Sequence, residues 1–144
     1  MQASAPCLSE SLQLYVKQSG LPYCSTFQGP GRWVAPEQYV GRLGLFRNQP
    51  ADTLLSAADG VICIGFDPVE YDPSIWNSDR QRQIVNVDVQ PADQDRAFLP
   101  RVELIGDLHQ TLIAMATLPA VTVSTDFLQL QRACAAELQA CLLY

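Results

Sequence analysis

Apolar residues follow two spacings along this chain, one typical of helices and one typical of buried strands. From Ser4 to Gly20 one helical face is apolar, carrying Leu8, Leu12, Tyr15 and Val16. Asn48 and Pro50 open a second helix with Leu54 and Leu55. Asp107 caps a third, which runs to about Met115, and residues 124–126 start a last one through Leu143.

Short apolar runs separate these helices. Residues 21–27, 60–64, 83–89 and 102–105 have the length and composition of strands, whereas 28–31 and 41–47 are rich in glycine and predict turns or loops. The run at 60–64 is continuously apolar, as in a strand covered on both faces. Strands that alternate with helices predict an α/β fold, a mostly parallel sheet with helices on both faces, Rossmann-like in type.

Composition narrows the function classes. The chain has 144 residues, 48% hydrophobic and 17% charged, which fits one globular domain. Its nine Lys and Arg residues are scattered and the net charge is −6, which argues against nucleic acid. No apolar run is long enough for a membrane span, and the N-terminus lacks the pattern of a signal peptide.

The five cysteines fit neither a disulfide framework nor a zinc site, because their number is odd and their spacing wide; they are Cys7, Cys24, Cys63, Cys134 and Cys141. We interpret them as buried thiols of a cytoplasmic protein.

Two features raise the possibility of a nucleotide site. Asp88 ends an apolar strand, where a Rossmann-like fold places the acid that binds a ribose, but any parallel strand can end in a polar residue. Gly29, Pro30 and Gly31 follow a strand without a third glycine or an immediate helix, so a tight turn is favoured over a phosphate cradle.

Other polar groups favour structural roles. His109 has no partner at a spacing typical of a base or metal ligand, which favours a solvated helix position. Asp67, Glu70 and Asp72 could bind a cation, but the Asp-Pro pairs are equally typical of turns. Trp76 behind them is expected to be an apolar lid or an interdomain contact. None of these groups forms a catalytic site or a metal site by itself.

Five segments, in order, resemble the central domain of acetolactate synthases of the catabolic, FAD-independent type. They are GRLGLFRNQ at 41–49, IGFDPVEY at 64–71, IVNVDVQP at 84–91, FLP at 98–100 and ELIGD at 103–107. The second departs from the family's pattern at Phe66, where tyrosine is usual. The agreement covers residues 21–115.

The resemblance implies that residues 1–144 are one domain of a three-domain enzyme that condenses two pyruvates to 2-acetolactate and CO2 in the acetoin and butanediol pathway. In such enzymes thiamine diphosphate and Mg²⁺ are held by the N- and C-terminal domains, so this chain carries no catalytic, cofactor or metal residue. Its partners would be those two domains, in a homo-oligomer. FAD-binding relatives have an arginine where this chain has Asp67. Gln28, Phe46 and Asp67 become candidates for the substrate-pocket loops.

The family also has a buried strand ahead of the segment that matches 1–5. Without it, backbone groups of the sheet would lack partners, so we expect a gap, a rearranged sheet or a self-associating edge.

Three function classes follow: a synthase scaffold inactive alone, a stand-alone FAD- or ADP-binding module using Asp88 and Asp107, and an interaction remnant that pairs with synthase subunits. The resemblance favours the first. Tight binding of FAD or ADP would favour the second, and association with a thiamine-dependent partner the third.

Overall fold

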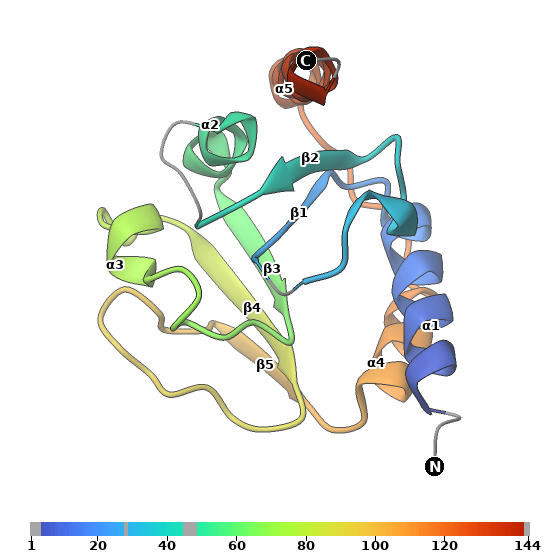
Figure 1. Cartoon of the computed structure of the whole chain (residues 1–144). Helices are drawn as coiled ribbons and strands as arrows, with labels where there is room; N and C mark the ends of the chain where they lie inside the picture. The colour runs from blue at the N-terminus through green and yellow to red at the C-terminus, as the bar shows by residue number, and fades with distance from the viewer. Residues whose placement is uncertain (1–3, 28, 45–48, 143–144) are drawn as a thin grey trace.

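Helices flank two small parallel sheets in this chain (Figure 1). The computed structural model describes residues 4–27, 29–44 and 49–142, with side chains from residue 8 to residue 140. The elements are α1 (Ser4–Ser19), β1 (Tyr23–Ser25), the 3-10 helix η1 (Arg32–Val34), β2 (Tyr39–Arg42), α2 (Pro50–Ala57), β3 (Gly60–Ile64), α3 (Pro73–Trp76), β4 (Gln83–Asp88), β5 (Val102–Ile105), α4 (Leu108–Met115) and α5 (Thr125–Leu142). Within these ranges, no helix combines the length and the hydropathy of a membrane span.

The strands form the orders β1-β2 and β3-β4-β5, with every pairing parallel. Helices α1 and α4 lie together on one side, and α2 and α5 on the other (Figure 1). The predicted α/β class with parallel strands and helices on both faces is confirmed. The two sheets share no pairing among the described residues, so the sheet is interrupted between β1 and β3.

Alternating side chains of β3 enter two different cores. Ile62 and Ile64 pack with the α1 and α4 cluster around Leu112. Val61 and Cys63 pack on the opposite face with Trp76. Apolar side chains on both faces explain why this strand is a continuous apolar run in the sequence.

The structure changes two local predictions. Strand β2 begins at Tyr39 and includes Gly41 and Arg42, where the sequence predicts a glycine-rich loop. Helix α3 begins at Pro73, where the Asp-Pro pair predicts only a turn, and Asp72 caps it by accepting a hydrogen bond from the Ser74 amide at 2.9 Å. The first prediction was wrong because it rested on the number of glycines, whereas a strand tolerates glycine where another element packs closely against it.

Trp76 packs inside this domain, where it belongs to a buried cluster and also lines the cavity beside β3. Its side chain is buried, and its ring lies edge-on to Phe66 and Phe98 with centroids 6.0 and 6.4 Å away. The indole N–H donates to the Tyr71 carbonyl at 3.2 Å, which satisfies its polar atom. Trp76 therefore anchors α3 to the core.

The cysteine prediction is confirmed for Cys63 and Cys134, which are buried free thiols, while Cys24 is half-buried. The side chains of Cys7 and Cys141 lie outside the described residues.

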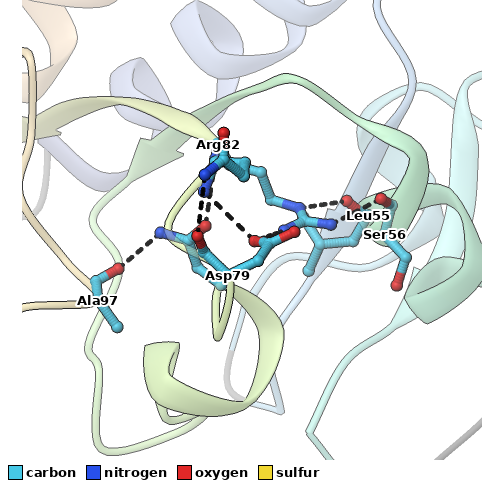
Figure 2. Close-up of polar contacts among 7 residues, drawn as sticks. Leu55, Ser56, Asp79, Arg82 and Ala97 are labelled. Carbon is cyan, nitrogen blue, oxygen red and sulfur yellow. Dashed lines mark hydrogen bonds and ion pairs between the residues drawn. The ribbon is translucent and has the colours of Figure 1, made fainter.

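Arg82 ties the start of β4 to the end of α2 (Figure 2). Its Nε donates to the Leu55 carbonyl at 2.9 Å and its Nη2 to the Ser56 carbonyl at 2.6 Å. These carbonyls belong to the last turn of α2, where the regular helical donors run out, although the Ala58 amide also reaches the Leu55 carbonyl at 3.2 Å. A cation at this end also interacts favourably with the negative end of the helix dipole, so Arg82 caps α2. Its Nη1 lies 2.7 Å from Asp79 Oδ1, whose side chain is half exposed.

We expect Arg82→Met to lower the free energy of unfolding by about 2 kcal/mol, because two carbonyls lose a charged donor. The matched control is Asp79→Asn, which removes only an exposed ion pair and should cost less than about 1 kcal/mol. Urea unfolding of the two variants measures both effects. Equal losses would show that the ion pair, rather than the helix cap, carries the contribution of Arg82.

Candidate functional site

A cavity of about 530 Å³ occupies the interruption between β1 and β3. Its side walls are those two strands. Leu8, Leu12 and Leu112 close one face from α1 and α4, while Tyr71 and Trp76 close the other. The lining is mostly apolar, so the cavity can take an apolar group, with polar atoms gathered at one end.

That polar end lies where β1 and β3 finish. The Thr26 hydroxyl, just after β1, donates to Glu70 Oε2 at 2.9 Å. Asp67 also lines the cavity, and its Oδ1 accepts the Val69 amide at 3.0 Å. The loops after the two strands are therefore joined, although the strands themselves are not. Ligand sites in open parallel sheets lie at this carboxyl edge.

Arg42 fixes the loop that follows β1. Its Nη1 donates to the carbonyls of Thr26, Phe27 and Gly29 at 2.8, 3.0 and 3.1 Å. One guanidinium nitrogen thus contacts three carbonyls of this loop. This role of Arg42 was not predicted, because its local signal is no more than an arginine directly after Gly41 at the end of an apolar pair.

The side chains of Cys24 and Cys63 line the cavity as unreactive thiols. Burial raises the pKa of Cys24 and of Cys63 to about 12. A thiol with so high a pKa stays neutral at ordinary pH and is a poor nucleophile. Cys24 and Cys63 therefore serve as small apolar wall residues.

The predicted site residues separate into three groups. Asp67 lines the cavity, and its place in a substrate-pocket loop stays a prediction. Gln28 and Phe46 fall outside the described residues. Asp88 and Asp107 lie beyond the cavity, at the ends of β4 and β5, where the Gly106 amide donates to the Asp88 carbonyl at 3.0 Å.

Both of these aspartates have local structural roles. An Asp88 side-chain oxygen accepts the Val89 amide at 2.6 Å. Asp107 accepts the Gln110 amide at 2.9 Å and caps α4, as the sequence predicts. His109 on the same helix is half-buried. The two aspartates are brought near each other, but each already holds a backbone donor.

The described residues do not fit a Mg²⁺–diphosphate site. No three His, Cys, Asp or Glu side chains among them are placed to share a metal ion. Asp67, Glu70 and Asp72 instead accept hydrogen bonds from three different partners, the Val69 amide, the Thr26 hydroxyl and the Ser74 amide. The interpretation of both Asp-Pro pairs as turns is confirmed, and Asp72 in addition caps α3.

Comparisons with known proteins agree with this architecture. The family model described as "Thiamine pyrophosphate enzyme, central domain" matches residues 2–115. Acetolactate synthase of Bacillus subtilis (strain 168) is 43% identical over 114 residues, which cover 78% of this chain and 20% of that protein. A catabolic acetolactate synthase of Raoultella terrigena is 48% identical over 79 residues, 55% of this chain and 14% of that protein. The chain thus matches a fifth or less of either relative's length.

Gly44 lets the loop after β2 approach the 67–71 loop. Its φ is +87°, and a Cβ there would lie 2.8 Å from the Glu70 carbonyl oxygen. We expect Gly44→Ala to cost about 3 kcal/mol in unfolding free energy, from the left-handed backbone and the clash together.

Gly20→Ala is the matched control, because Gly20 has φ +70° and nothing within 4 Å of the added atom. It should cost about 1 kcal/mol in the same denaturant titration. Similar costs for the two would mean that the close approach at Gly44 is unimportant.

Proposed function

Because the chain belongs to the family of thiamine pyrophosphate enzyme central domains, we propose that it is the scaffolding domain of an acetolactate synthase. The whole enzyme would convert two pyruvates to 2-acetolactate and CO2. Thiamine diphosphate and Mg²⁺ would be held by the N- and C-terminal domains of the same polypeptide, in a cytoplasmic homo-oligomer. Support comes from the two relatives with that name and from the absence of a metal-binding trio in the described part of this chain.

The observation that carries the proposal is the fixed carboxyl edge. Arg42 holds the loop after β1, and the Thr26–Glu70 hydrogen bond joins it to the loop after β3. An edge held in this way presents Asp67 in a constant position to whatever lies against it. The domain would contribute one wall of the pyruvate pocket and leave the chemistry to the cofactor-bearing domains.

A nucleotide-binding role is not favoured. Asp88 and Asp107 are engaged by backbone amides, and neither lines the cavity between β1 and β3. No further observation among the described residues supports the FAD- or ADP-binding alternative.

Asp67 is tested in a chimera, the Bacillus subtilis relative with its matching segment replaced by residues 2–142 of this chain, so that α5 keeps its place against β2 and α2. We expect the chimera to form acetolactate. Asp67→Arg should then lower kcat/KM about tenfold, equivalent to about 1.4 kcal/mol, because it brings bulk and opposite charge to the pocket edge.

The control is Val69→Arg, which adds the same side chain to the same loop at a position 91% exposed. It should leave kcat/KM unchanged. An active chimera that is indifferent to Asp67→Arg would remove this loop from the pyruvate pocket. A folded but inactive chimera would count against the synthase assignment itself.

The 144-residue chain alone should not turn over pyruvate when it is supplied with thiamine diphosphate and Mg²⁺. The physical reason is that no three His, Cys, Asp or Glu side chains among its described residues are placed to share a metal ion. Acetolactate is detected colorimetrically after acid decarboxylation to acetoin, with the Bacillus subtilis enzyme as positive control. Product above the no-enzyme blank would overturn the scaffolding role.

A further inference from the structure

A second cavity, of about 210 Å³, lies where β4 and β5 begin. Its lining combines three arginines with an asparagine and two aliphatic side chains: Arg80, Arg82, Arg96, Asn77, Ile84 and Leu99. All but Ile84 belong to the segments that lead into β4 and β5, and Ile84 is the second residue of β4. The cavity therefore lies at the amino edge of this sheet, and it shares no lining residue with the cavity beside β3.

Positive charge is concentrated here in an otherwise acidic chain. Four of the nine Lys and Arg residues lie between positions 80 and 101, although the net charge of the chain is −6. No Asp or Glu among the described residues lines this cavity. Asp93 and Asp95, in the loop that carries Arg96, are exposed and form no ion pair with it. The cavity therefore has a positive lining without carboxylates.

The three arginines differ in their partners. The guanidinium of Arg82 is turned toward the carbonyls at the end of α2 and is paired with Asp79 (Figure 2). Arg80 and Arg96 are exposed, and neither side chain makes a hydrogen bond or an ion pair with another described residue. Each guanidinium offers five N–H donors. Two unneutralised guanidinium groups therefore line one cavity.

Buried Asn77 fixes the two segments that carry these groups. Its backbone carbonyl accepts the Arg80 amide at 3.0 Å, and its side-chain oxygen accepts the Arg82 amide at 3.2 Å. Its side-chain nitrogen donates to the carbonyl of Ala97, the residue after Arg96, at 2.8 Å. One asparagine thus holds the turn before β4 against the loop before β5. A ligand between Arg80 and Arg96 meets backbone that is already in place, which lowers the entropic cost of binding.

The backbone of Arg80 is strained. Among the described residues other than glycine, only Arg80 takes a positive φ, at +57°. Glycine and asparagine are the usual residues in this conformation, because a Cβ crowds the following carbonyl oxygen. Folding alone therefore favours glycine at position 80. Strain of this kind is concentrated at functional sites, and a ligand for the guanidinium accounts for an arginine here.

We propose that this cavity binds a small organic phosphate monoester, with the phosphate group between Arg80 and Arg96. A phosphate monoester carries about two negative charges near pH 7, which match two guanidinium groups, whereas a carboxylate needs only one. Ile84 and Leu99 supply apolar surface for the organic part. The cavity is smaller than the ~300 Å³ at which drug-sized sites begin, so the ligand is small. This inference goes beyond the proposed function and does not depend on it.

The test is calorimetric titration of the purified chain with phenyl phosphate at low ionic strength, where exposed charges are screened least. Saturable binding at one site supports the proposal, and no binding overturns it. Benzoate, with one charge and two oxygens, should bind at least about tenfold more weakly, and equal affinity would overturn the preference for phosphate. Inorganic phosphate should bind about tenfold more weakly than phenyl phosphate, because it buries no apolar surface. Equal affinity for inorganic phosphate would overturn the organic ester as the ligand.

A matched pair of variants locates the site. Arg96→Met removes one guanidinium from the cavity and should weaken phenyl phosphate binding at least about tenfold. Arg132→Met makes the same charge change at an exposed position of α5 and should leave the affinity unchanged. Equal effects of the two would show attraction to the overall charge, an adventitious ion only, and overturn the site. Arg96→Lys keeps the charge but loses the planar fork, so wild-type affinity in this variant would overturn recognition by two forks.

Arg80→Gly separates a role in binding from a role in folding. Glycine relieves the backbone strain at φ +57°, so this variant should melt about 3 °C higher than the wild type. It should also bind phenyl phosphate at least about tenfold more weakly, and this loss cannot come from unfolding in a more stable protein. A lower melting temperature would show that Arg80 serves the fold, and unchanged affinity would show that its guanidinium does not meet the phosphate. Either result overturns the proposal.

Discussion

The two sheets share no backbone ladder among the described residues, so side-chain contacts must hold them together, and α2 provides such a connection. Ala51 and Leu54 of this helix pack in the core beside β2, while Leu55 contacts both that core and the one beneath β3. Asp52 accepts the Tyr71 hydroxyl at 2.9 Å, and Arg82 binds the carbonyls at the other end of the helix. Helix α2, with eight residues, thus connects the two sheets by side-chain contacts where no backbone hydrogen bonds join them.

The sequence predicted those parts of the fold whose cause is local. The apolar run at 60–64 and the cap at Asp107 carry their signals within a few residues, and both are confirmed. Strand β2 was missed because Gly41 takes φ +114° beneath α5, a long-range contact that local propensity cannot express. The burial of Trp76 likewise depends on Phe98, more than twenty residues away.

The candidate site was predictable only in part, for the same reason. Asp67 was found because its loop has a distinctive sequence and follows a strand. Arg42 and the Thr26–Glu70 hydrogen bond were missed, since their partners are set by how the two sheets meet. The interruption of the sheet came from a family resemblance, because apolar alternation says that a strand forms but not which neighbour it lacks.

The last helix bears on where such a domain can be cut. Residues 2–115 match the family, yet α5 begins at Thr125 and lies across β2 and α2. Cys134 belongs to the same buried cluster as Val40, and Leu138 lies 3.5 Å from the position a Cβ would take on Gly41. A fragment trimmed to the matched range would expose an apolar surface that water does not meet in the full chain. For anyone expressing or transplanting this domain, the stable unit extends a helix beyond the part that resembles its relatives.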